Sequence, residues 1–136
     1  MNRSILIGYQ LLIGFSDTLT GALLIITPEF ALRLMGLHAP SDALPFVSYI
    51  GAFVFSVGLA CIYGVFVIVC HRSPCRLEAI WILTAITRAS VAIFVVTQIL
   101  AHALEVDWLT VAFFDGACVL LQAIGLRKGW VAHVAW

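Results

Sequence analysis

The stretch that decides the fold is Pro45–Val69, PFVSYIGAFVFSVGLACIYGVFVIV, which contains no charged residue. A helix needs about 20 consecutive apolar residues to cross the hydrocarbon core of a membrane, and this stretch is longer than that. Three further apolar segments of spanning length accompany it: Ile5–Ile26, Leu77–Ala101 and Trp108–Leu126. The sequence therefore predicts an all-α, polytopic membrane protein with four spanning helices.

The composition of the whole chain points to the same class. Of its 136 residues, 63% are hydrophobic and 10% are charged, and the mean hydropathy is +1.12. A soluble domain has about 25% charged residues. Seven basic and seven acidic residues give zero net charge, which argues against a nucleic-acid partner because such partners select basic surfaces. The length predicts a single transmembrane domain over residues 1–136.

The first apolar segment differs from a secretion signal. Such signals have an apolar core of about 7–15 residues and a small-residue cleavage site. The segment Ile5–Ile26 is longer, contains Asp17, and is not followed by a good cleavage site of that kind. We therefore expect it to be retained as the first spanning helix.

Local signals mark where the helices begin and end. Thr27-Pro28 is typical of an N-cap followed by the first helical residue, and predicts a short amphipathic helix over Glu29–Met35 that Gly36 ends. We expect this helix to lie along the membrane surface. Ser73-Pro74 repeats the same signal before the third span, and Asp107 is placed to cap the fourth. The expected apolar face of the short helix comprises Phe30, Leu34 and Leu37.

The basic residues are distributed unevenly between the two sides of the predicted membrane. Cytoplasmic segments carry the excess of Lys and Arg. The connections on one side have only Arg33. Five basic residues lie at the N-terminus, in the loop between the second and third spans, and at the C-terminus: Arg3, Arg72, Arg76, Arg127 and Lys128. This predicts a multi-pass protein of a bacterial cell inner (cytoplasmic) membrane with both termini in the cytoplasm.

Each predicted span contains polar residues that repeat at intervals of seven. Positions seven apart nearly superpose on a helix, so each set forms one row, and we expect the rows to face the interior of an antiparallel four-helix bundle. The rows are Gln10 and Asp17; Tyr49, Ser56 and Tyr63; Trp81, Arg88, Val95 and His102, flanked by Thr84 and Gln98; and Trp108, Asp115 and Gln122.

Three of these residues, Asp17, Arg88 and Asp115, are ionisable and lie well inside spans. A charged side chain at the centre of a spanning helix costs at least about 2.5–3.5 kcal/mol, so we expect them to pair. Their depths favour an Asp17–Arg88 pair, with Asp115 above it toward His102. Two carboxylates against one guanidinium leave an excess negative charge, which a proton, a bound cation or an ionisable ligand would balance.

The polar rows have three interpretations. They could only fix the register of the bundle, through an ion pair and interhelical hydrogen bonds. They could bind a small lipophilic or amphipathic ligand, with a quinone headgroup favoured, or they could conduct protons or ions in an oligomer. The residues expected in this ligand-binding or buried polar cluster are Asp17, Arg88, Asp115, Gln10, Tyr49, Ser56, Thr84, Gln98, His102 and Gln122.

A further row on the second span has small side chains, and it predicts the close approach of a neighbouring helix. Its residues are Ala52, Ser56, Ala60 and Gly64. Because nearly all of the surface is available to lipid or to other helices, an accessory subunit of a larger membrane complex, or a homo-oligomer, is an alternative function.

Chemistry by the isolated chain is not indicated. We find no nucleophile with a base and an orienting group, and no cofactor motif. Cys61 and Cys118 lie in spans, where a thiol behaves as a small hydrophobe, and the spacing of Cys70 and Cys75 is not a standard metal or redox signature. His102 and Glu105 could share a face, but a metal would need further ligands. We therefore predict no metal site.

The first half of the chain has a pattern of glycines around a proline-initiated helix. Gly14 and Gly21 precede the stretch TPEFALRLMGL at Thr27–Leu37, and Ile50-Gly51-Ala52 and Val57-Gly58-Leu59 follow in the second span. This half resembles small four-helix membrane proteins of the DoxX-like group. That group includes proteins linked with quinone-dependent sulfur oxidation and others without an assigned role, so the resemblance implies a quinone ligand. It identifies no functional residue.

Overall fold

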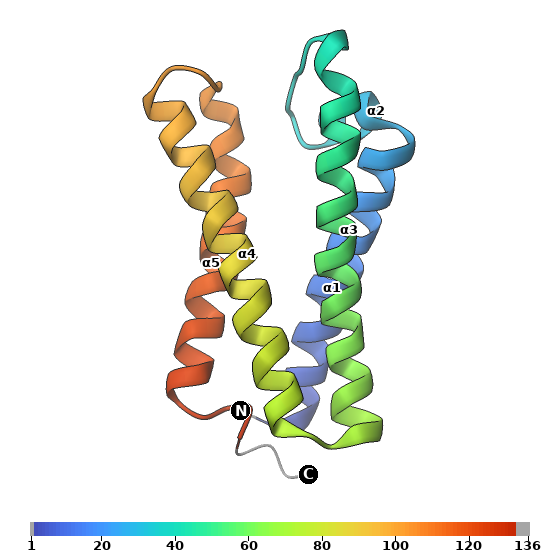
Figure 1. The fold of residues 1–136 in the computed structure, drawn as a ribbon, viewed down its shortest axis with the longest axis vertical. Coiled ribbons are helices and arrows are strands. Elements are labelled where there is room, and N and C mark those ends of the chain that lie inside the picture. The colour runs from blue at the N-terminus through green and yellow to red at the C-terminus, as the bar shows by residue number, and fades with distance from the viewer. Residues whose placement is uncertain (1, 133–136) are drawn as a thin grey trace. The chain divides into compact units, whose positions relative to one another are not determined.

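The computed structural model describes residues 2–132, and these form helices and connecting turns without a β-strand. The long helices are α1 (Arg3–Ile26), α3 (Leu44–Phe66), α4 (Pro74–Leu100) and α5 (Leu109–Arg127). The short helix α2 (Pro28–Leu34) lies between α1 and α3 in the chain (Figure 1). Four helical segments are long and apolar enough to cross a membrane. The all-α fold with four spans and a short helix is thus confirmed, and the chain is a multi-pass membrane protein.

Short turns of other helix types extend the spans. A 3₁₀ turn, η1 (Ser41–Ala43), precedes α3, and a π turn, η2 (Val67–His71), follows it. The amide of Arg72 donates to the carbonyl of Val67 at 2.8 Å and closes the π turn, with Arg72 in the left-handed region at φ 47°. A second 3₁₀ turn, η3 (Val106–Trp108), precedes α5.

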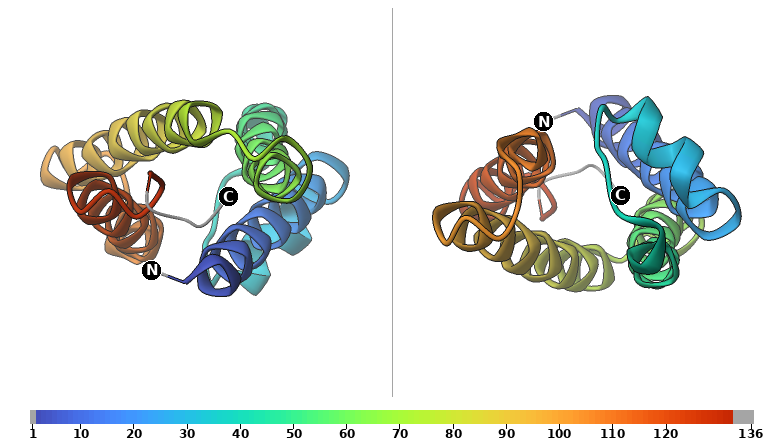
Figure 2. Two further views of the ribbon diagram at one scale, coloured as in Figure 1. Left: turned by 90° about the horizontal axis from the view of Figure 1, so that it is seen from below. Right: turned by 90° about the horizontal axis from the view of Figure 1, so that it is seen from above.

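Contacts between helices divide the described chain into two units, residues 2–72 and residues 73–132. In the first unit α1 lies beside α3, which runs in the opposite direction, and α2 packs at the junction between them (Figures 1 and 2). In the second unit α4 and α5 form a hairpin. Each unit is therefore an antiparallel pair of spanning helices. The single domain expected over residues 1–136 stays a prediction.

The α1–α3 pair packs backbone against backbone at glycines. A Cβ atom built on Gly51 would lie 2.7 Å from the Cβ of Leu24 and 3.0 Å from the carbonyl oxygen of Gly21, and one built on Gly21 would meet the backbone of Phe55. Lipid tails are as apolar as the side chains, so the hydrophobic effect does not drive helices together in a membrane, and close van der Waals packing contributes instead. The four glycines that make this approach possible are Gly14, Gly21, Gly51 and Gly58.

The packing of α3 against α1 shows that the second span turns a different face inward from the one predicted. Tyr49 is 65% exposed and Tyr63 46% exposed, and Ser56 is exposed and donates its hydroxyl to its own helix, at 2.7 Å from the Phe53 carbonyl. The inward polar row was therefore wrong for this helix. Positions 49 and 56 lie two residues before Gly51 and Gly58, about 200° around the helix, so a face built on those glycines turns the polar row outward.

The small-residue row from Ala52 to Gly64 does not form the contact with α1. Ala52 and Ser56 are exposed, whereas Gly51, Gly58, Cys61 and Gly64 are buried. The close approach uses the glycines spaced by seven, because they have the smallest side chains at the crossing.

Helix α2 ends as predicted, but its buried face differs from the prediction. Gly36 has φ 71°, and the Leu37 amide donates to the Leu32 carbonyl at 2.8 Å, which is the hydrogen bond of a glycine-ended helix. Leu37 is 1% exposed and lies with buried Leu32, whereas Phe30 and Leu34 are exposed. The expected face of Phe30, Leu34 and Leu37 is therefore corrected: the chain turns at Gly36, so Leu37 no longer follows the helical repeat.

The proline signals are confirmed, whereas the side-chain caps are not. Pro28 and Pro74 begin α2 and α4, but Thr27 and Ser73 make no capping hydrogen bond. The Thr27 hydroxyl instead donates back to the Leu23 carbonyl at 3.2 Å. Asp107 lies within η3, a position too early to cap α5, because the helix is entered through that 3₁₀ turn.

Candidate functional site

Three contacts between α4 and α5 form a continuous row that we call the α4–α5 seam. The three α4 residues are three and four positions apart, and their α5 partners, in reverse order, are three and seven positions apart. Positions three, four or seven apart share a helix face. The contacts pair Trp81 with Gly125, Thr84 with Gln122, and Arg88 with Asp115.

The charged contact of the seam is an ion pair inside the spanning helices. Arg88 Nη1 donates to Asp115 Oδ1 at 2.5 Å, and the two side chains are 5% and 13% exposed. The Arg88 guanidinium also lies over the Phe114 ring, with its Cζ atom 5.6 Å from the ring centroid, within the range of cation–π attraction. The pair is electrically neutral, which lowers the cost of placing both ions away from water.

The uncharged contact leaves one polar atom without a partner. Gln122 Nε2 donates to Thr84 Oγ1 at 2.8 Å, and the Thr84 hydroxyl donates to the Ile80 carbonyl at 2.8 Å. Gln122 is 1% exposed, and its Oε1 atom accepts no hydrogen bond from any residue that the structure describes. An unsatisfied buried acceptor costs about 1–3 kcal/mol. The seam therefore presents an acceptor to which a bound molecule could donate.

The aromatic contact closes the seam at its third position. Trp81 is completely buried, and a Cβ built on Gly125 would lie 2.5 Å from Trp81 Cζ3 and 2.8 Å from Trp130 Cε3. The indole thus occupies the space that any larger residue at position 125 would take. Gly125 was not among the expected site residues, although its place three residues after Gln122 is a signal that the sequence contained.

The first unit contains its own buried polar residues. Gln10 is 1% and Asp17 6% exposed, both on α1. Neither amide atom of Gln10 has a hydrogen-bond partner among residues 2–132. Arg88 contacts Asp115 directly, in agreement with the expectation that the three ionisable residues pair with one another. Because Asp17 belongs to the other unit, its pairing with Arg88 stays a prediction.

Two expected site residues at the far end of α4 lie outside the seam. The helix ends at Leu100, and His102 is exposed in the left-handed region at φ 57°, with its amide donating to the Ile99 carbonyl at 3.0 Å. The row of seven thus stops at buried Val95, and the expected position of His102 on the row was wrong because the backbone turns first. Gln98 is only half-buried.

The remaining candidate residues do not assemble into a centre. Cys61 and Cys118 are buried, whereas Cys70 and Cys75 are exposed free thiols. Among the described residues, no group of three or more histidine, cysteine, aspartate or glutamate side chains is arranged to bind a metal ion.

Comparison with protein-family models, with curated proteins and with solved structures finds no match for this chain. The resemblance of its first half to the DoxX-like group therefore stays a prediction, and the function has to be argued from the residues.

Proposed function

We propose that the polar interior of this protein binds a small lipophilic or amphipathic ligand, and that this ligand is a quinone. The observation that carries the proposal is the buried Oε1 atom of Gln122, which accepts no hydrogen bond within the described part of the chain. An unsatisfied buried acceptor costs about 1–3 kcal/mol of free energy, and a ligand that donates a hydrogen bond to this atom would remove that cost.

The chemistry of the α4–α5 seam suits both redox forms of a quinone. A quinol has hydroxyl groups that donate, which matches Gln122 Oε1. A quinone has carbonyl groups that accept, and the guanidinium of Arg88, a group of N–H donors, lies on the same seam, where it binds Asp115. The buried indole of Trp81 adds an apolar surface. The resemblance to the DoxX-like group supports the same ligand class.

The proposal includes a location and an orientation. We propose a bacterial inner membrane with both chain termini in the cytoplasm. Four residues that support this orientation through the positive-inside rule are exposed, as basic residues outside a membrane core should be. They are Arg72, Arg76, Arg127 and Lys128.

A titration with a water-soluble short-chain quinone tests the ligand. Quinones quench indole fluorescence, and Trp81 lies in the seam. We expect saturable quenching in detergent-solubilised protein. Gln122→Leu should bind the quinone at least about fivefold more weakly, because a lost hydrogen bond is worth about 1 kcal/mol. Gln98→Leu, which removes a half-buried amide outside the seam, is the matched control and should bind as the unaltered protein does. Equal affinity in the Gln122 and Gln98 variants would refute the assignment.

A second function, as an accessory subunit of a larger membrane complex or as a homo-oligomer, is supported by the exposed face of α3. Tyr49, Ser56 and Tyr63 lie on it, and the packing against α1 leaves them exposed. Native mass spectrometry from a gentle detergent distinguishes this function. A strict monomer without a partner would count against it.

Proton or ion translocation by an oligomer is a third hypothesis, which the burial of Asp17 and Asp115 inside spans motivates. Flux into liposomes should then be lost in Asp17→Asn and Asp115→Asn. If both variants showed the same flux as the unaltered protein, this hypothesis would be refuted.

A further inference from the structure

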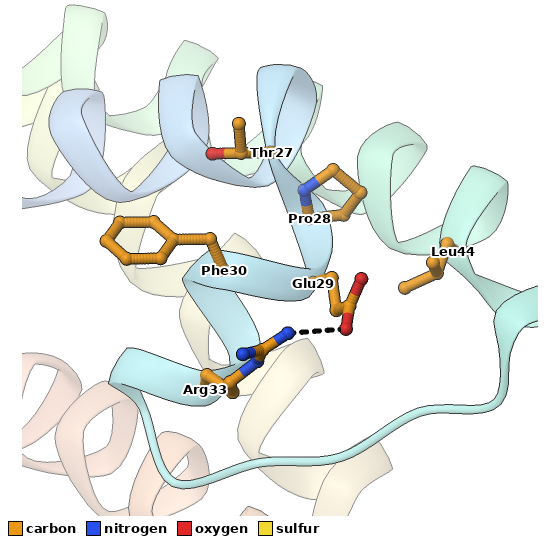
Figure 3. A pocket seen from close by; sticks show the side chains of 6 residues that line it. All are labelled: Thr27, Pro28, Glu29, Phe30, Arg33 and Leu44. Carbon is orange, nitrogen blue, oxygen red and sulfur yellow. Dashed lines mark hydrogen bonds and ion pairs between the residues drawn. The ribbon is translucent and has the colours of Figure 1, made fainter.

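A pocket of ≈ 390 Å³ lies in the first unit, where α1, α2 and α3 meet. It is lined by Thr27 at the end of α1, by residues of α2, and by Leu44 at the start of α3 (Figure 3). Its lining combines apolar groups with one cation and one anion: Thr27, Pro28, Glu29, Phe30, Arg33 and Leu44.

The two charges in the pocket face one another but remain open to the surroundings. Arg33 Nη2 donates to Glu29 Oε1 at 2.6 Å, and each side chain is 69% exposed. Figure 3 shows the carboxylate of Glu29 between the guanidinium of Arg33 and Leu44. The contact uses one oxygen of Glu29 and one terminal nitrogen of Arg33, so both groups can bind a further partner. An exposed pair of this kind contributes only about 0–1 kcal/mol to stability.

The pocket lies at the depth of lipid headgroups. Helix α1 has 24 residues, which span about 36 Å at 1.5 Å per residue, so its end reaches past a hydrocarbon core of about 30 Å. Ile26 and Leu34, which are next in the chain to the lining residues Thr27 and Arg33, are 76% and 65% exposed. Such apolar side chains next to an exposed ion pair are typical of a segment at the boundary between acyl chains and headgroups.

We propose that this pocket binds the headgroup of a zwitterionic phospholipid with a primary ammonium group, that is, phosphatidylethanolamine. Arg33 would bind the phosphate, Glu29 would accept hydrogen bonds from the ammonium, and Phe30 and Leu44 would contact the upper acyl chain. The match is one of charge: a lining with one cation and one anion complements a headgroup that carries one of each.

The same charges select against two related lipids. An anionic phosphatidylglycerol would bring its phosphate to Arg33 without an ammonium for Glu29, and Asp42, two residues before Leu44 in the chain, is also acidic. A phosphatidylcholine headgroup has no N–H to donate to a carboxylate. This site lies within residues 2–72 and does not depend on the α4–α5 seam.

Native mass spectrometry in detergent with an equimolar mixture of the three lipids tests the proposal. We expect one phosphatidylethanolamine to bind at least about fivefold more strongly than either competitor, a difference of about 1 kcal/mol. Glu29→Gln removes the ammonium partner and leaves Arg33, so the preference should turn toward phosphatidylglycerol. Arg33→Gln should lose the preference and the affinity together.

The double variant Arg76→Gln/Glu78→Gln is the matched control, because it removes one exposed cation and one exposed anion at the start of α4, in the other unit. It should keep the preference. Circular dichroism of each variant establishes that its helices are intact. Equal binding of the three lipids by the unaltered protein would overturn the proposal, as would a preference that neither Glu29→Gln nor Arg33→Gln changes.

Discussion

Arg88 and Asp115 form the charged contact between α4 and α5, inside two spanning helices. Their contact is short and both side chains are almost entirely buried. In such pairs the attraction roughly offsets the cost of desolvation, whereas removing one partner leaves an uncompensated charge. The pair therefore fixes which faces of α4 and α5 meet.

This asymmetry gives a prediction for single and double variants. Arg88→Leu should lower the free energy of unfolding by about 3 kcal/mol, because the carboxyl of Asp115 loses its partner. Arg88→Leu/Asp115→Leu should recover part of that loss, since no buried charge then remains on Asp115. Reversible unfolding in mixed micelles measures both. A double variant less stable than Arg88→Leu would contradict the pairing.

Backbone conformation gives a second prediction at this scale. Gly36 has φ 71°, and a Cβ there would meet nothing within 4 Å, so Gly36→Ala changes only the backbone energy and should destabilise by about 1 kcal/mol. Gly8 has equally open surroundings within α1, where alanine is the better helix former, so Gly8→Ala should be neutral or stabilising. Thermal unfolding of both variants provides the comparison. Equal shifts would show that the left-handed turn at Gly36 does not matter.

The sequence predicted the ionisable residues of the site and that they pair with one another, but it did not single out the Arg88–Asp115 contact. Charge and depth indicated Asp17, Arg88 and Asp115 as buried, because intramembrane charges are rare and have to be compensated. The Arg88–Asp115 contact depends on α4 and α5 being neighbours, and spacing along one helix does not contain that information. His102 was misplaced because a histidine in the left-handed region gives no sequence signal as clear as glycine does.

At the scale of elements, the pair α1–α3 depends on glycines spaced by seven on both helices. A Cβ on Gly58 would meet the amide nitrogen of Thr18 and lie 2.5 Å from its Oγ1 atom. That hydroxyl already donates to the Gly14 carbonyl at 2.6 Å, so it is not free to move away. The crossing therefore has no space for even one methyl group.

This predicts the effect of one methyl group on the helix pair. Gly58→Ala should destabilise the first unit by about 1–3 kcal/mol, the range for overpacking, because backbone atoms of α1 would have to move. Gly116→Ala in α5 has no atom within 4 Å of the new Cβ and serves as the control. Protease resistance and thermal unfolding in detergent measure both variants. Indistinguishable stability of the two would argue against the glycine crossing.

The spanning helices themselves were predictable, and the face that α3 turns inward was not. Length and hydropathy specify a span because the membrane requires about 20 apolar residues. The second span, however, contains a polar row, a small-residue row and the pair Gly51 and Gly58, each of which could mark a contact. The glycines Gly51 and Gly58 decide the face through close packing, which depends on matching Gly14 and Gly21 on the partner helix.

At the scale of the whole molecule, the proposed orientation in the membrane rests on where the basic residues lie. If both termini are in the cytoplasm, as proposed, the loop containing Cys70 and Cys75 is cytoplasmic and Ser41 lies on the opposite side. Both cysteines and Ser41 are exposed. A membrane-impermeant maleimide added to intact cells should therefore leave the unaltered protein unlabelled and should label Ser41→Cys. Labelling of Cys70 or Cys75 from outside the cell would contradict the proposed orientation.

The central claim is that the polar interior binds a quinone, and the most direct measurement is mass spectrometry of lipid-soluble molecules that remain with gently purified protein. The unaltered protein should retain a quinone in a fixed ratio to protein, and Gln122→Leu should lose most of it, whereas Gln98→Leu should retain it. The absence of any quinone from the unaltered protein, together with no response to added quinone, would contradict the claim.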